Sequence, residues 1–313
     1  MLGIRHPIIQ GGLAYLAYAE LAAAVSNAGG LGQITATFVG EAEWLRREIA
    51  KVRSLTDKPF GVNFSLGRRF SMDLVEVAVE EGVPVVSITG GNPEPVLARL
   101  AATPIKKMAL VAGVRQAQKA ESLGADIVIA VGFEGGGHIG RDDVTTMVLV
   151  PRVVQAVGVP VVASGGIADG RGLAAALALG AEGIEMGTRF VATRECIAHP
   201  NYKEALVKAK ETDTVVIERT IGRPARTLRS PYTEDILARE AKGAAADELL
   251  PLVSGEANCR AAIEGYLERG FAWAGQGVGL IDDVPSVAEL LARVMAEAAE
   301  ACERVARMRR GQR

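Results

Sequence analysis

A histidine that directly follows three glycines is the feature of this chain best suited to chemistry. Residues 132–146 read GFEGGGHIGRDDVTT and follow an apolar run at Ile127–Val131, which is typical of a buried parallel strand. Glycines such as Gly136 let the backbone approach a ligand closely. The imidazole of His138 can accept or donate a proton near neutral pH. We predict that His138 is catalytic; the alternative is a loop histidine that only bonds to nearby backbone groups.

Two further glycine turns follow the last two apolar runs of the repeating pattern. Ser164, Gly165 and Gly166 end one run, and Gly187 and Thr188 follow the next. In (β/α)₈ barrels, the loops after the seventh and eighth strands commonly bind phosphate through backbone N–H groups. We therefore predict a phosphate-bearing cofactor or substrate at these turns. The alternative is a pair of tight turns that bind nothing.

Amide side chains lie at the ends of two other predicted strands. Gln10, Gly11 and Gly12 end the first strand, and Asn63 lies at the end of the third. Because the carboxyl ends of parallel barrel strands share one rim, these groups could hydrogen-bond a polar heterocycle bound there. Each of them alone is equally well explained as a structural residue.

Short apolar runs alternate with helical patterns over the first two-thirds of the chain. In a fold with such alternation, the candidate site residues at the ends of the apolar runs lie on one rim. Eight strand–helix units in about 190 residues match a (β/α)₈ (TIM) barrel, whereas a doubly wound sheet more often has five or six strands. The fold class predicted is therefore α/β. The predicted strands are Pro7–Gln10, Leu31–Thr35, Pro59–Phe64, Pro84–Thr89, Lys107–Val111, Ile127–Val131, Pro160–Ser164 and Gly183–Met186.

The alternation stops near His199. Residues 200–270 are polar, charged and helix-prone, with no run typical of a parallel strand. We predict a barrel formed by residues 1–198 and 271–313, with a small helical insertion or lid at residues 199–270. A long amphipathic helix at Val284–Arg309 should close the barrel.

Composition excludes several function classes. The 313 residues are 49% hydrophobic with a net charge of −2, which argues against a broad nucleic-acid surface. Three cysteines without paired spacing indicate reduced thiols and no metal site. Asp142 and Asp143 lack a histidine or glutamate at ligand spacing, so we predict that they form salt bridges or cap a helix. No apolar run reaches the ~18 residues of a membrane span, and we expect a cytoplasmic protein.

Seven motifs together resemble one family. The set resembles the nitronate monooxygenases, formerly grouped as 2-nitropropane dioxygenases, a family that includes NADH-dependent enoyl-ACP reductase II and NADH:quinone reductases. The resemblance covers nearly the whole chain. The motifs are PIIQGG (7–12), AAAVSNAGGLG (22–32), DKPFGVN (57–63), GGGHIG (135–140), GGIADGRG (165–172), MGTRFVATRE (186–195) and AGQGVGLI (274–281).

The resemblance implies a TIM barrel with FMN at the carboxyl-terminal rim. The turns at residues 165–166 and 187–188 would hold the FMN phosphate, residues 10–12 and Asn63 would line the isoalloxazine, and His138 would be the active-site histidine. The cofactor-binding set is Gln10, Gly11, Gly12, Asn63, Gly136, Ser164, Gly165, Gly166, Gly187 and Thr188.

For activity, the resemblance implies oxidation of alkyl nitronates by O₂ to a carbonyl compound and nitrite. The first alternative is a reductase that uses NADH or NADPH and acts on enoyl-ACP or a quinone. Gly11-Gly12-Leu13 stands where many nitronate monooxygenases have Ala-Pro-Met, which is more similar to the reductase branches. Arg68 and Arg69 would suit a phosphate-bearing partner such as acyl carrier protein. A homodimer and a flavin-free barrel that binds a phosphate ligand also stay open.

Overall fold

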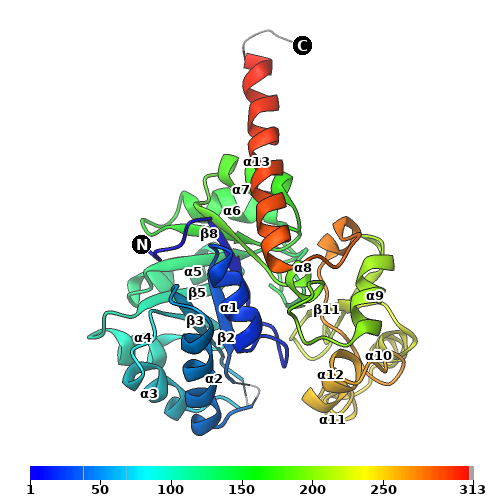
Figure 1. Ribbon diagram of the computed structural model, residues 1–313. Coiled ribbons are helices and arrows are strands. Elements are labelled where there is room, and N and C mark those ends of the chain that lie inside the picture. Colours follow the sequence, from blue (N-terminus) through cyan, green and yellow to red (C-terminus); the bar gives the residue numbers. More distant parts are fainter. Residues whose placement is uncertain (38, 68, 310–313) are drawn as a thin grey trace.

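Eight parallel strands form the barrel that the sequence predicts (Figure 1). The computed structural model describes residues 1–37, 39–67 and 69–309, so Arg68 lies outside the described residues. The strand order is β1-β9-β8-β6-β5-β4-β3-β2, and a parallel bridge between Ile9 and Leu31 closes the ring. The strands are β1 (Ile8–Gln10), β2 (Gly32–Thr35), β3 (Phe60–Ser65), β4 (Val85–Thr89), β5 (Lys106–Val111), β6 (Ile127–Val131), β8 (Val161–Ser164) and β9 (Gly183–Met186).

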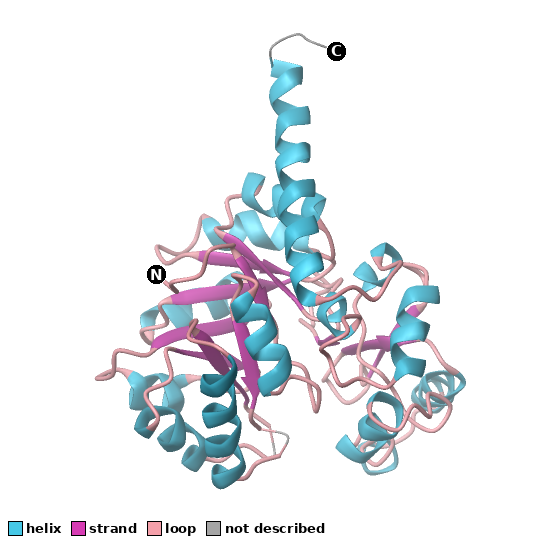
Figure 2. Ribbon diagram, viewed as in Figure 1, coloured by secondary structure: helices cyan, strands magenta, loops and turns pink. Residues whose placement is uncertain are grey.

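Helices surround the barrel and bury their apolar faces against it (Figure 2). A separate apolar cluster that includes Met108 and Ile129 is contributed by the strands; such packing fills the inside of a barrel of this size. The partly buried Leu110 and Val131 pack on this cluster and also line the cavity described below. The surrounding helices are α1 (Ala19–Asn27), α2 (Ala42–Leu55), α3 (Met72–Glu80), α4 (Glu94–Leu100), α5 (Val114–Ser122), α6 (Thr146–Val154), α7 (Gly170–Ala178) and α8 (Thr188–Val191).

The segment between α8 and η1 lies to one side of the barrel and contains four helices (Figure 1). Its helices are α9 (Pro200–Lys208), α10 (Pro231–Ala241), α11 (Ala246–Leu249) and α12 (Gly255–Ala262). Sequence analysis expected helices alone, but the segment also contains two antiparallel strands, β10 (Thr214–Ile217) and β11 (Ala225–Leu228). β11 also pairs with β7 (Gly137–His138), so backbone hydrogen bonds join the insertion to the histidine loop. The division into two domains stays a prediction.

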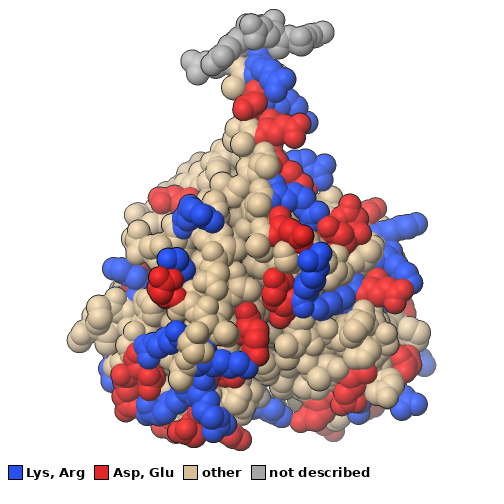
Figure 3. All heavy atoms as spheres, in the orientation of Figure 1, with Lys and Arg blue, Asp and Glu red and all other residues tan. Residues whose placement is uncertain are grey.

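The chain returns to the barrel through the 3₁₀ helix η1 (Gln276–Leu280) and ends in α13 (Val287–Arg309). As predicted, α13 is long and amphipathic, and it packs against α7 and α1. Buried Leu290, Leu291 and Val294 form its apolar face. The carboxyl-terminal part extends beyond the barrel and carries both acidic and basic side chains (Figure 3).

Candidate functional site

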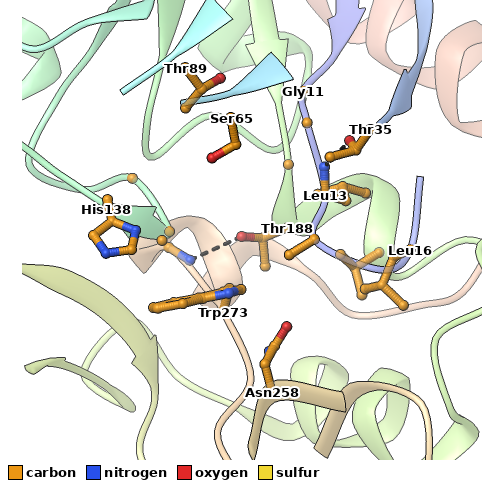
Figure 4. A pocket seen from close by; sticks show the side chains of 18 of the residues that line it. Gly11, Leu13, Leu16, Thr35, Ser65, Thr89, His138, Thr188, Asn258 and Trp273 are labelled. Atoms are coloured by element: carbon orange, nitrogen blue, oxygen red, sulfur yellow. Dashed lines mark hydrogen bonds between the residues drawn. The ribbon is translucent and has the colours of Figure 1, made fainter. Parts of the chain in front are cut away.

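A cavity of about 520 Å³ lies at the carboxyl ends of the barrel strands, between the barrel and the insertion. All the predicted site residues except Gln10 line it, and Figure 4 shows several of them around the open space. Loops that are far apart in the sequence therefore meet at one rim, as the barrel topology requires. The predicted residues that line the cavity are Gly11, Gly12, Asn63, Gly136, His138, Ser164, Gly165, Gly166, Gly187 and Thr188.

The first of the two glycine turns adopts a backbone conformation that other residues rarely take. Gly165 and Gly166 have φ values of +95° and +75°, a region that favours glycine. A Cβ on Gly165 would lie 3.0 Å from the carbonyl oxygen of Gly132. On the neighbouring turn, the Thr188 hydroxyl accepts a hydrogen bond from the Gly275 N–H at 3.0 Å. Among the described residues that hydroxyl donates to no protein acceptor, so its proton is available to an anion.

The start of α7 is closed to a phosphate group. The Gly170 N–H donates to Glu297 Oε2 at 2.8 Å, and the Gly172 N–H donates to Asp169 Oδ1 at 2.9 Å. Two carboxylates therefore occupy this helix N-terminus and would repel an anion. Asp169 caps α7. A phosphate would have to bind before the helix, at the 165–166 and 187–188 turns.

His138 faces the cavity from β7, with its side chain 48% exposed. Arg223 Nη2 lies 3.2 Å from the imidazole Nε2. Because a guanidinium can only donate, Nε2 accepts this bond, and the proton of a neutral ring lies on Nδ1. The Trp273 ring packs beside the imidazole, with the two centroids 5.5 Å apart. His138 is therefore held by neighbours from the insertion and the return segment and can exchange a proton with a bound molecule.

Gln10 ends β1 as predicted but does not line the cavity. Its side chain is fully buried; Nε2 donates to the Gly11 carbonyl oxygen, and Oε1 accepts from the Gln33 N–H at 2.9 Å. The bond with Gln33 joins β1 to β2 where the barrel closes, so the amide stabilises the barrel wall. By contrast, Asn63 lines the cavity and donates to Ser87 Oγ and Thr89 Oγ1, at 2.8 and 3.0 Å.

A buried carboxyl group at the rim was not predicted. Glu185, on β9, is only 4% exposed, and its Oε2 accepts a hydrogen bond from Ser164 Oγ at 3.0 Å. Oε1 has no hydrogen-bond partner among the described residues. Burial raises the pKa of this carboxyl to about 7, against the opposing effect of the Ser164 hydrogen bond. A polar ligand atom at the rim could pair with Oε1. The only signal in the sequence is an acidic residue inside an apolar strand.

The wall on the insertion side is mainly apolar and was also missed. Phe271 and Trp273 pack edge to face, with centroids 4.6 Å apart, and both line the cavity with Val253 and Ala262. The motif AGQGVGLI (274–281) is notable in the sequence for its glycines. Nothing in the pattern indicated that the aromatic rings before it face the histidine.

The described residues contain no cluster of histidine, cysteine or acidic side chains that could hold a metal ion. As predicted, Asp143 forms a salt bridge, here with Arg219 at 3.1 Å. Within the described ranges, no helix is both long enough and apolar enough to cross a membrane.

Comparison with known proteins agrees with this geometry. The family model described as Nitronate monooxygenase matches residues 1–297. A solved structure of FabK from Thermotoga maritima is 46% identical, with a TM-score of 0.92, over 97% of this chain and 96% of that one.

Two curated relatives are also similar. The (3aS,4S,5R,7aS)-5-hydroxy-7a-methyl-1-oxo-octahydro-1H-indene-4-carboxyl-CoA dehydrogenase of Mycobacterium tuberculosis is 34% identical over 95% of this chain and 94% of its own length. A probable nitronate monooxygenase of Staphylococcus saprophyticus is 38% identical over 74% of this chain and 78% of its own.

Proposed function

The chain belongs to the nitronate monooxygenase family of oxidoreductases, and on that premise we propose that it is an FMN-dependent reductase that uses NADH or NADPH to reduce an enoyl thioester. The observation that carries the proposal is the shared cavity. It joins the two glycine turns, His138 and an apolar wall in a single space. Such a space suits a phosphate-bearing heterocycle beside an apolar substrate.

The residues present fit FMN. The glycine turns leave room for a phosphate group, and a Cβ on Gly166 would lie 3.0 Å from Glu134 Cβ. The Thr188 hydroxyl can donate to the phosphate, and the unpartnered Oε1 of Glu185 can bond a polar atom of the cofactor. Bound flavin would supply hydride transfer, which no side chain of the protein can provide.

The protein's own residues would bind, orient and exchange a proton. His138 could supply, from its imidazolium form, the proton that the carbon next to the thioester carbonyl group takes up, and the ring would return to the neutral form. Arg223 and Trp273 would hold the ring in place, through the 3.2 Å contact and the ring packing. The apolar wall would exclude water from the reacting carbons.

Two observations favour a thioester over a nitronate. Leu250 and Val253 of the insertion also line the cavity, and this apolar wall suits a substrate with an apolar acyl chain. One of the similar proteins also points to a thioester, because the M. tuberculosis relative is named as a carboxyl-CoA dehydrogenase. Gly11-Gly12-Leu13 adds the sequence argument given above.

Oxidation of alkyl nitronates is the second candidate. It is supported by the family model across residues 1–297 and by the S. saprophyticus relative. In that reaction His138 would bind or deprotonate the substrate. The two candidates share the cofactor site and differ in what delivers electrons to it.

Steady-state assays in air separate the candidates. FMN-loaded protein is mixed with NADH or NADPH and crotonyl-CoA in one series, and with a nitronate alone in the other. We expect NAD(P)H consumption that depends on crotonyl-CoA and yields butyryl-CoA. Nitrite release from the nitronate, without NAD(P)H consumption in the first series, would instead assign the protein to the second candidate.

A further inference from the structure

Asn258, on α12, presents an unused hydrogen-bond acceptor at the cavity wall. The residue is only 3% exposed yet lines the cavity. Its Nδ2 donates to the carbonyl oxygen of Phe271 at 3.0 Å. Turning the amide over would set two oxygen atoms against each other, so the orientation is fixed. Oδ1 consequently faces away from Phe271, and it has no hydrogen-bond partner in the described parts of the chain.

No donor of the described residues reaches this oxygen. Figure 4 shows Asn258 directed toward the space between Trp273 and Leu16, and Val253 and Ala262 line the same wall. A buried acceptor without a donor costs about 1–3 kcal/mol, and native proteins seldom tolerate one without reason. A donor on a bound molecule would remove that cost.

Contacts with the barrel hold α12 in a defined place. Arg69 Nη2 and Glu256 Oε1 form a salt bridge of 2.9 Å between the loop after β3 and the helix. A Cβ on Gly255 would lie 2.0 Å from the Tyr15 hydroxyl, so only glycine lets that ring pack on the first turn of α12. The acceptor therefore keeps a defined position relative to the flavin-binding rim.

We propose that Asn258 Oδ1 accepts a hydrogen bond from a secondary amide N–H of the substrate's pantetheine arm. This assignment rests on the proposed function. Thioesters of coenzyme A and of acyl carrier protein share that arm, a slender chain with two secondary amides. An acceptor in an apolar wall between the insertion and the reaction centre suits such a chain. Asn258 would recognise the pantetheine arm of the carrier, and the residues of the barrel rim would bind the acyl group.

Two small thioesters test the assignment. S-crotonyl-N-acetylcysteamine has one secondary amide N–H, and its N-methyl derivative has none. The holoenzyme should show a KM about three- to tenfold lower for the N–H compound, the range expected for one hydrogen bond. The variant Asn258→Leu, which has similar volume and no acceptor, should lose this preference and keep its KM for the N-methyl compound. The comparison of the two compounds on the wild-type enzyme remains valid even if the variant does not fold.

Each other outcome overturns a particular claim. Equal KM values for the two compounds in the wild-type enzyme would remove Asn258 from substrate recognition. A rise in the KM for NADH alone in Asn258→Leu would assign the oxygen to the nicotinamide carboxamide and overturn the thioester assignment. Failure to reduce either compound would overturn the proposed function itself, a result distinct from the loss of preference.

Discussion

The buried carboxyl group of Glu185 should make the stability of the protein depend on pH. Its side chain has one hydrogen bond, from Ser164 Oγ, and burial raises its pKa from the ordinary 4.5 to about 7. Between these two pH values the folded protein keeps a proton that the unfolded chain has lost. The free energy of unfolding therefore falls as pH rises through this window.

The size of the effect follows from the two pKa values. Each pH unit between them corresponds to about 1.4 kcal/mol, so the whole window amounts to on the order of 3 kcal/mol. The contribution is fully present below the unfolded value and lost above the folded one. Replacing Glu185 by glutamine keeps the shape and the Ser164 contact but removes the titration.

Urea unfolding of flavin-free protein at about pH 5 and about pH 8 measures this contribution. Wild-type protein should lose on the order of 3 kcal/mol more than Glu185→Gln between the two conditions. Glu182→Gln, which alters an exposed carboxyl group just before β9, is the matched control and should follow the wild type. Parallel behaviour of wild type and Glu185→Gln would refute the argument that burial keeps this group protonated.

Three further substitutions test the site and its support. His138→Ala should keep FMN and lower turnover by ~10²- to 10⁴-fold, the usual contribution of an acid–base group; an unchanged rate would remove His138 from the mechanism. Gly166→Val should weaken FMN binding because its φ of +75° disfavours a side chain, whereas Gly113→Val, with nothing within 4 Å, should not; full flavin occupancy in Gly166→Val would contradict the phosphate site. Arg189→Met should lower the free energy of unfolding by about 1–3 kcal/mol, because the carbonyl oxygens of Ala192 and Asp283 lose the hydrogen bonds that they accept from the buried Arg189 guanidinium; an unchanged urea midpoint would show that these bonds do not support the fold.

Most of the barrel could be predicted because its signal is local. Parallel strands buried on both faces appear as short apolar runs, and glycine turns mark their carboxyl ends. The strands β7, β10 and β11 were missed for the opposite reason. They have two to four residues each. In addition, His138 of β7 pairs with Ala225 of β11, far along the chain, and no local pattern reveals such a pairing.

Residues that line the cavity could be predicted where the residue type alone indicates chemistry. Residues whose importance depends on burial could not be predicted. His138 and the glycine turns have a meaning that can be read from the sequence. Gln10 is an amide at the end of a barrel strand, as a cofactor-binding residue would be. Its side chain instead hydrogen-bonds β2 where the barrel closes. Glu185 and Asn258 become notable only because each has a buried oxygen without a partner. That condition depends on neighbours contributed by other parts of the chain.

The central claim is that the cavity binds FMN and passes electrons from NAD(P)H to an enoyl thioester. A single-turnover experiment without oxygen tests it most directly. FMN-loaded protein is first mixed with NADH or NADPH and then, after removal of excess nucleotide, with crotonyl-CoA. We predict loss of the visible flavin absorbance in the first step, and its return with formation of butyryl-CoA in the second. A protein that binds no FMN, or a flavin that neither nucleotide reduces, would contradict the account.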